Sequence, residues 1–429
     1  MFTKEQNDTL CRVGPDTPMG QLMRRHWLPA CLSEEVAEPD GTPVRTKLLG
    51  EWVVVFRDSE GKLGALDDRC PHRKASLSFG RNEECGLRCL YHGWKFAVDG
   101  TVLDMASEPN AERKMKSITH RAFPVEESGG FVWVYLGPAE NMTPFQPPAW
   151  APFPGIKTSV VKIRTECNWA QVLEGSIDSA HSSSLHSTNM PPAEDVEGST
   201  ATEDAWLRPS NDKSPKLEIE MTDYGFTYAA LRKPIVDPDN NVYVRTTTFI
   251  APFTVLIPPN NQYHLSQILF PMDDENTMFY WIAWHPDPEK GISQDDWRKF
   301  CAARVGIELD ENYDKFLNIG NWYKQDRDVM KKGDFTGIPG IPAQDMAMWE
   351  SMGPITDRSD EILGSSDLSI VKFRQQMLKA AEDVAGGGEA IGTSPEGIRH
   401  VDLRTYERIL PKSQDWRTFQ PERELEAAE

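Results

Sequence analysis

The chain has 429 residues and a formal net charge of −20 at pH 7, and such an acidic surface repels the phosphates of nucleic acids and of anionic membranes. It contains no run of about 20 apolar residues, so the sequence predicts no membrane span. Its seven cysteines are odd in number and scattered, which favours a cytoplasmic protein with reduced thiols over a disulfide framework. The length exceeds that of one typical core, so we expect two domains.

Short strands dominate the first part of the chain, after a brief helical turn expected at residues 20–27. Apolar, β-rich runs alternate there with turn signals such as Asp99-Gly100. The expected strands occupy residues 45–49, 52–56, 62–66, 93–97 and 131–136. This pattern predicts a small antiparallel β domain whose loops can present functional side chains.

Two pairs of metal-binding side chains lie between these strands. Cys70 and His72 alternate along one loop, and Cys89 and His92 are three positions apart on another. Two thiolates and two imidazoles suit a Rieske 2Fe–2S cluster, with both thiolates on one iron and both imidazoles on the other. A structural zinc site is an alternative, although zinc ribbons usually show Cys-x2-Cys pairs. A second alternative is that these cysteines and histidines are only core residues, as we expect for Cys85.

A proline-rich segment, residues 137–158, follows this β region. Such a segment cannot form a helix and lacks the alternation of a strand, so it is typical of a linker. We therefore expect one domain at residues 1–157 and a second at residues 158–429.

A second metal-binding motif follows a helix expected at residues 168–174. It comprises Asp178, His181 and His186. On a regular helix the two histidines would point about 140° apart, so we expect the chain to break in the serine run at 182–184. Two imidazoles and a nearby carboxylate suit a mononuclear iron with open coordination positions. A histidine that only packs or faces solvent is the plainer alternative.

A facial triad of iron ligands needs a further carboxylate, and spacing alone does not choose it. The downstream candidates are Asp326, Asp328, Asp334, Asp345, Glu350 and Asp357.

The rest of the chain predicts a larger domain of strands and helices. Residues 189–214 are polar and rich in turn formers, which is typical of a mobile loop over a pocket. Strands are expected at residues 216–233, 242–258, 263–272 and 277–284, and helices at 293–309 and 367–384. The fold class is therefore α+β, with a polar tail at 389–429 whose position the sequence does not decide.

The motifs resemble those of the Rieske non-heme iron oxygenases. Cys70-Pro71-His72-Arg73 and Cys89-Leu90-Tyr91-His92-Gly93-Trp94 match the family's cluster motifs, and Asp-x2-His-x4-His is similar to its iron motif. Residues 10–30 and 345–354 resemble the phthalate 4,5-dioxygenase group within that family. The resemblance implies a catalytic domain in which an antiparallel sheet of helix-grip type is flanked by helices.

The resemblance also implies roles for individual residues. His181 and His186 would bind iron, and Asp178 would bridge one iron histidine to a cluster histidine of a neighbouring subunit. Asp345 would complete the triad, because its Gln-Asp context with a following Glu matches the family. Arg208, Arg245 and Ser179 would bind the carboxylate of the substrate; surface positions for the two arginines are the alternative.

The implied activity is that of the oxygenase (alpha) subunit of a multicomponent system. Such a subunit uses O2 and electrons from an NAD(P)H-dependent reductase, which carries flavin and an iron–sulfur centre, to hydroxylate an aromatic carboxylate such as phthalate. Homotrimers or stacked trimers are the expected assemblies. O-demethylation of a methoxylated acid and dioxygenation of a chlorobenzoate stay open. A Rieske electron carrier and a hydrolase with structural zinc are the alternatives from other classes.

Overall fold

The structure is a computed structural model, and it describes residues 2–151, 156–196, 206–260, 263–287, 289–394, 398–400 and 403–419. The chain forms two compact units. One comprises Val13–Gln146, and the other combines Met1–Arg12 with Pro147–Glu429. These bounds differ from the expected division at residue 157, because the first helix, α1 (Lys4–Cys11), packs against helices of the C-terminal unit.

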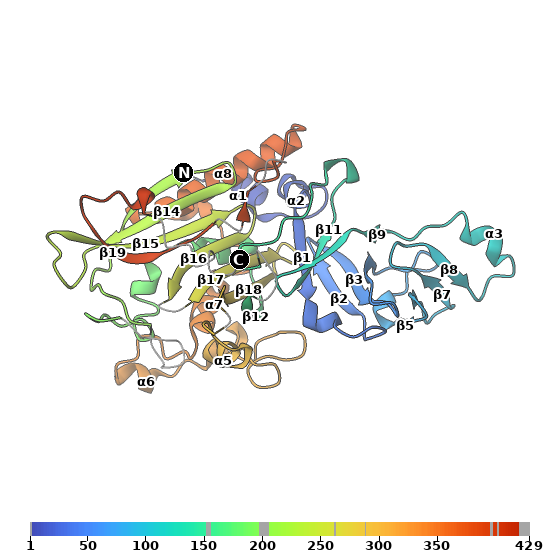
Figure 1. Cartoon of the computed structure of the whole chain (residues 1–429), viewed down its shortest axis with the longest axis horizontal. Helices are drawn as coiled ribbons and strands as arrows, with labels where there is room; N and C mark the ends of the chain where they lie inside the picture. The colour runs from blue at the N-terminus through green and yellow to red at the C-terminus, as the bar shows by residue number, and fades with distance from the viewer. Residues whose placement is uncertain are drawn as a thin grey trace. The chain divides into compact units, whose positions relative to one another are not determined.

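The unit of residues 13–146 is built from three small antiparallel sheets, drawn in blue to cyan in Figure 1. Its helices are α2 (Pro18–Met23) and α3 (Ala111–Met115). The first sheet contains, in spatial order, β1 (Trp27–Leu32), β11 (Phe131–Tyr135) and β10 (Val125–Ser128). The second contains β2 (Val44–Leu48), β3 (Glu51–Arg57), β4 (Leu63–Asp67) and β9 (Ala122–Phe123). The third contains β5 (Arg81–Glu83), β6 (Gly86–Arg88), β7 (Trp94–Phe96) and β8 (Val102–Met105). The expected small β domain is confirmed, although Trp27 begins a strand and does not continue the helical turn.

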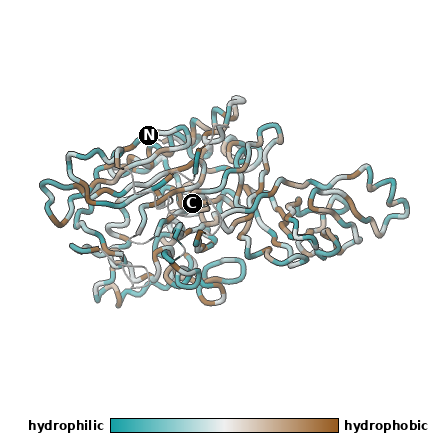
Figure 2. Tube along the Cα trace, in the orientation of Figure 1, coloured by the Kyte–Doolittle hydropathy of each residue, from teal (hydrophilic) through white to brown (hydrophobic). Residues whose placement is uncertain are grey.

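The C-terminal unit is organised around one eight-stranded antiparallel sheet. Its strands are β12 (Lys157–Thr165), β18 (Thr277–His285), β17 (Tyr263–Pro271), β16 (Thr254–Asn260), β15 (Asn241–Ile250), β14 (Gly225–Arg232) and β13 (Lys216–Met221), with β19 (Glu407–Pro411) paired to β15. β18 is buried along its whole length, so both faces of the sheet are covered there. Figure 2 shows apolar segments recurring along the strands and hydrophilic segments in the loops.

Helices pack on this sheet and carry the polar groups described below. α4 (Trp169–Ser176) contacts β16, β17 and β18, and α8 (Leu368–Ala385) contacts β13 and β14. Besides α1, the other described helices of the unit are α5 (Gln294–Phe300), α6 (Arg327–Lys331) and α7 (Ile341–Ser351). In the described part of the chain, no helix is both long and apolar enough to cross a bilayer.

Local sequence features explain why three elements have bounds that differ from the expected ones. The strand expected at 216–233 is a hairpin, because the chain turns just before Gly225, whose φ of +156° suits glycine. The strand expected at 242–258 is interrupted around Ala251-Pro252, where proline cannot donate to a sheet. The helix expected at 293–309 ends at Phe300, and Ala302 adopts a φ of +50°.

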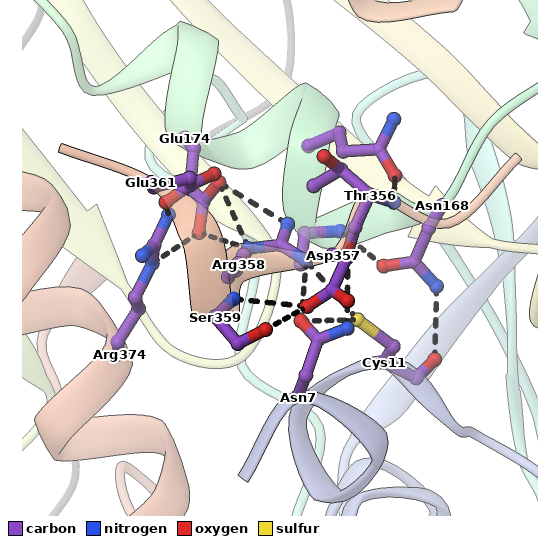
Figure 3. A network of polar contacts seen from close by, with 12 residues as sticks. Asn7, Cys11, Asn168, Glu174, Thr356, Asp357, Arg358, Ser359, Glu361 and Arg374 are labelled. Atoms are coloured by element: carbon purple, nitrogen blue, oxygen red, sulfur yellow. Dashed lines mark hydrogen bonds and ion pairs between the residues drawn. The ribbon is translucent and has the colours of Figure 1, made fainter. Parts of the chain in front are cut away.

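A buried ionic network fixes α4 against its surroundings (Figure 3). Glu174 accepts hydrogen bonds from Arg358 at 2.9 Å and from Arg374 of α8 at 2.7 Å, and all three side chains are buried. Burial raises the pKa of Glu174, but the two guanidiniums outweigh it and lower the pKa below its usual range. Arg358 also donates to Asn7 and Cys11, so α1 is bound to the same network.

Replacing Glu174 by alanine should lower the melting temperature strongly, because two buried guanidiniums would lose their shared carboxylate. Removing one partner of a buried ion pair costs about 3–5 kcal/mol. Lys379→Ala on α8 is the matched control, since its pair with Asp383 is exposed and contributes at most about 1 kcal/mol. Scanning calorimetry of both variants checks this; equal shifts would show that the network does not stabilise the unit.

Candidate metal centres

The first candidate centre lies on two similar turns of the N-terminal unit. The amide of Lys74 donates to Cys70 O, the amide of Gly93 donates to Cys89 O, and both donors have positive φ values of +62° and +74°. Cys70 and Cys89 are buried, at 1% and 2% exposure. Each turn therefore holds its cysteine inward by the same backbone geometry, at the positions that the sequence predicted.

The histidines of these turns lie nearer to solvent. The rings of His72 and His92 are 4.4 Å apart between centroids, and His72 also stacks on Trp94 at 4.7 Å. His72 is exposed and His92 is half-buried. Burial, only partly offset by a backbone hydrogen bond from His72, raises the pKa of Cys70 to about 11. A buried thiol of this kind becomes a thiolate when a cation takes the place of its proton.

The second candidate centre is formed by three side chains from two distant segments. Nε2 of His186 lies 2.9 Å and Nε2 of His181 lies 3.5 Å from the same oxygen, Oδ1 of Asp345. The ligand atoms of these three residues all lie within 4.8 Å of one another, as one ion requires.

The expected break between the two histidines is present. A short 3-10 helix at His181–Ser183 follows α4, and the chain then turns, so that His186 points back toward His181. Asp345 comes from α7, a helix that the sequence analysis did not predict. Most of α7 is buried, so its sequence lacks the polar face that marks an amphipathic helix.

Close packing between α4 and α7 brings these three side chains together. Gln171 donates to the carbonyls of Trp349 and Gly353, at 3.1 and 3.0 Å. Gly175 lies directly against Trp349, since a Cβ at position 175 would be 2.1 Å from the indole nitrogen. Glu350 fixes the same helix by accepting from Lys315 at 2.8 Å. The distance between the two helices is thus set by polar contacts and one glycine.

Asp178 lies behind His181. Its Oδ2 is 3.5 Å from Nδ1 of His181, and its Oδ1 accepts from the amide of Ala180 at 2.7 Å. Burial lowers the pKa of His181, but Asp178 and Asp345 outweigh it and raise the pKa above its usual value. Carboxylates on both sides of an imidazole provide the negative surroundings that a bound cation needs.

A cavity that is open to solvent adjoins the three side chains, and all three contribute to its lining. Its wall combines polar groups, including Ser179 and Arg245, with apolar and aromatic side chains such as Ile257, Leu265 and Trp281. A wall that combines apolar and aromatic side chains with a few polar and charged groups suits an aromatic anion.

The arginines of this region are buried, which excludes the surface positions considered for Arg208 and Arg245. Arg245 lines the cavity and forms an ion pair with Glu407 of β19, at 3.1 Å. Burial and the nearby charge of Arg245 lower the pKa of Arg208 to about 10. Arg208 donates to Met190 O and Ser183 Oγ, and it does not line the cavity.

Sequence reasoning missed three further residues near the site. Arg232 is buried and donates to the carbonyl and the hydroxyl of Ser179, at 2.6 and 3.2 Å. Within the described ranges, neither Arg208 nor Arg232 has a carboxylate at ion-pair distance. The second is Glu407 of the C-terminal tail, which pairs with Arg245. The third is Gln344, whose side-chain oxygen accepts a hydrogen bond from His186. Nothing in the sequence distinguishes Arg232 and Glu407 from surface residues, and Gln344 served only as the context that selected Asp345.

Comparisons with known proteins agree with this geometry. Residues 26–124 match the family described as Rieske [2Fe-2S] domain, and residues 134–429 match LigXa C-terminal domain like. The chain is 53% identical to the phthalate 4,5-dioxygenase oxygenase subunit of Pseudomonas putida, over 98% of this chain and 95% of that protein. It is 37% identical to the 3-chlorobenzoate-3,4-dioxygenase oxygenase subunit of Comamonas testosteroni, over 99% of both.

Solved structures share the fold at low sequence identity. Dicamba monooxygenase bound to dicamba is 19% identical with a TM-score of 0.58, over 85% of this chain and 98% of that chain. The NdmA QL mutant with theobromine, from Pseudomonas putida CBB5, is 18% identical with a TM-score of 0.60, over 86% and 94%.

Fold and site together define an iron-dependent oxygenase that takes electrons through a Rieske domain. The chain belongs to the Rieske non-heme iron oxygenases, as an oxygenase subunit. It accordingly uses a Rieske 2Fe–2S cluster and a mononuclear iron, and it depends on an electron donor.

Replacing Gly175 by alanine should separate α4 from α7 and weaken iron binding. Overpacking of this kind costs about 1–3 kcal/mol. Because the iron-free protein can relax this strain and the iron-bound protein cannot, the same free energy weakens Fe²⁺ binding roughly ten- to a hundredfold. Gly364→Ala is the control, because its Cβ would meet nothing closer than 3.6 Å. Anaerobic Fe²⁺ titration measures the effect; parental affinity in Gly175→Ala would refute the packing argument.

Proposed function

We propose that the chain dihydroxylates an aromatic dicarboxylate of the phthalate type, giving a cis-4,5-dihydrodiol. The observation that carries this proposal is the cavity wall beside the His-His-Asp group. That wall contains Arg245, and Arg208 and Arg232 are buried nearby. Of these three arginines, Arg245 has a carboxylate at ion-pair distance among the described residues, that of Glu407. The relative that is 53% identical is named for phthalate.

The ligand sets follow from the donor chemistry. Cys70 and Cys89 would hold one iron of the cluster, and His72 and His92 would hold the other. His181, His186 and Asp345 would hold the mononuclear iron as a facial triad. The convergence of both Nε2 atoms on one carboxylate oxygen supports the second set.

When bound, the cluster supplies single electrons and the mononuclear iron supplies the site where O2 is reduced. The overall reaction adds both atoms of O2 to the ring and consumes two electrons and two protons. Arg245 binds a substrate carboxylate by a charge-assisted hydrogen bond, and the Ser179 hydroxyl adds a second contact. Trp281 and Leu265 pack on the ring and exclude water, so that one edge of the ring faces the triad.

Asp178 would connect the two centres. Its Oδ2 lies 3.5 Å from Nδ1 of His181, and its side chain is 20% exposed. In a head-to-tail homotrimer or stacked trimers, a cluster histidine of a second copy would approach this carboxylate. The exposure of His72 supports such a contact.

The electron donor would be an NAD(P)H-dependent reductase with flavin and an iron–sulfur centre. Its two-electron oxidation of NAD(P)H matches the two electrons that the reaction consumes. A cytoplasmic location would suit this nucleotide and the seven cysteines, none of which forms a disulfide.

Oxygen uptake with a panel of aromatic acids tests the proposed activity. With a reductase of this type, phthalate should drive uptake and yield a cis-dihydrodiol, while benzoate, with one carboxylate, should have a higher KM. Formaldehyde release from methoxylated acids, without turnover of phthalate, would instead identify an O-demethylase. Preference for 3-chlorobenzoate would identify the other open activity.

Arg245→Met should raise the KM for phthalate, since loss of a buried charged partner costs about 2–5 kcal/mol. The double variant Arg245→Met/Glu407→Gln removes both members of the ion pair and so avoids an uncompensated buried carboxylate. Both variants should have a raised KM for phthalate if Arg245 binds the substrate. An unchanged KM in the double variant would exclude that role, and Arg417→Met on the surface controls for net charge.

Asp178→Asn should leave both metal centres filled and slow turnover roughly a hundredfold. The amide keeps the size of the side chain but lacks the charge that pairs with histidine. Asp328→Asn, an exposed carboxylate on α6, is the control. Reoxidation of the reduced cluster by O2 and substrate, followed by stopped-flow absorbance, isolates the step; a parental rate in Asp178→Asn would exclude the bridge.

A further inference from the structure

Gln344 lies directly behind one of the three converging side chains. It is adjacent to Asp345 on α7 and is 2% exposed. Its amide contacts three groups: Oε1 is 2.8 Å from Nδ1 of His186, and Nε2 donates to Ile338 O at 2.9 Å and to Asn189 Oδ1 at 3.1 Å. The amide therefore uses both of its hydrogens and its oxygen within the protein.

The orientation of this amide follows from its neighbours. A backbone carbonyl can only accept a hydrogen bond, so the group facing Ile338 O must be the NH2 of Gln344. The oxygen must then face His186. A reversed amide would set its oxygen against the Ile338 carbonyl oxygen, so that two acceptors would be in contact without a hydrogen between them.

The orientation of the amide in turn determines the state of His186. An amide oxygen has no hydrogen to give, so Nδ1 of His186 must carry the proton. Nε2 is then the nitrogen with the free lone pair, and it is the one that points at Asp345 Oδ1, 2.9 Å away. Metal-binding histidines generally donate their second ring nitrogen to such an acceptor, which fixes both tautomer and ring orientation.

We propose that Gln344 is a positioning residue that selects the nitrogen His186 offers to iron and ties that ring to α7. One helix then carries a ligand and, at the adjacent position, the group that orients another ligand. The two histidines differ in this respect, because His181 faces the carboxylate of Asp178 and His186 faces a neutral amide. This inference rests on the proposed role of His186 as an iron ligand.

The same amide links the iron site to the cavity wall. Asn189 shares its side chain with Gln344 and accepts at its backbone oxygen from the amide of Trp206, at 2.8 Å. Trp206 lines the cavity. Gln344 thus lies between a histidine of the triad and the segment that begins at Asn189.

Gln344→Met tests the proposal, because methionine keeps the approximate volume and apolar stem but offers Nδ1 no amide oxygen. Fe²⁺ affinity, measured anaerobically by competition with a chromophoric chelator, should fall roughly ten- to a hundredfold. The absorbance of the Rieske cluster should stay at the parental value, since the other unit is unchanged. The melting temperature should fall by an amount similar to that in Gln294→Met, the control described below, because both variants leave buried partners without an amide. Nitrogen hyperfine couplings in the nitric oxide complex of the ferrous site should show an altered contribution from one imidazole.

Two control variants separate positioning from general damage. Gln294→Met also removes a side-chain amide that bridges backbone groups, both of Val160, but it is on α5, and it should keep parental affinity. Asn189→Ala removes one partner of Gln344 and leaves its oxygen fixed by Ile338, so its affinity should fall less than that of Gln344→Met. If Gln344→Met does not fold, Gln344→Asn, which withdraws the oxygen by one methylene, takes its place.

The outcomes are distinguishable. Parental Fe²⁺ affinity and unchanged couplings in Gln344→Met would overturn the role of Gln344 while leaving the ligand set intact. A parental protein without a mononuclear Fe²⁺ site would overturn the proposed ligand set itself. A loss of affinity in Gln294→Met equal to that in Gln344→Met would show that the effect is structural.

Discussion

The contact between α4 and α7 is the constraint on which the candidate iron site depends. The histidines follow α4 in the chain, and Asp345 lies on α7, about 160 residues later. Glycine at 175 lets the helices approach, and Gln171 fixes their register. Each helix is also held by a buried carboxylate with a cationic partner: Glu174 of α4 pairs with Arg374, and Glu350 of α7 pairs with Lys315. Buried ion pairs add little net stability, but here they define the positions from which the ligands project.

Charge is distributed unevenly between the surface and the interior. The chain is strongly acidic as a whole, whereas its cavity region holds Arg208, Arg232 and Arg245 with Glu407 as the carboxylate at ion-pair distance. Surface charge is screened within about 10 Å in salt, so an anion that reaches the cavity interacts mainly with the buried guanidiniums. Among the described residues, Arg208 and Arg232 have no carboxylate at ion-pair distance, and burying guanidiniums in this state costs free energy. Such a cost is typical of sites that a ligand completes.

Sequence alone predicted the parts of this protein whose chemistry is local. The cluster loops and the break after His181 follow from short spacings, and α8 (Leu368–Ala385) follows from its apolar stripe. It missed α7, which is buried nearly all round and so lacks an amphipathic pattern. It also assigned residues 1–157 to one domain, whereas α1 packs against α4 and α8, because packing partners are not encoded in adjacent residues. Among the polar side chains, Arg232 and Gln344 were missed for the same reason: their roles come from tertiary contacts. The loop expected at 189–214 falls partly outside the described residues.

Metal and sulfide analysis of the protein purified without added metal tests the central claim most directly. The account predicts about three irons and two acid-labile sulfides per chain, one cluster and one mononuclear site. Two irons with two sulfides, unchanged after ferrous iron is added back, would leave only an electron carrier. Zinc without sulfide would contradict both metal centres and, with them, the assignment of oxygen chemistry.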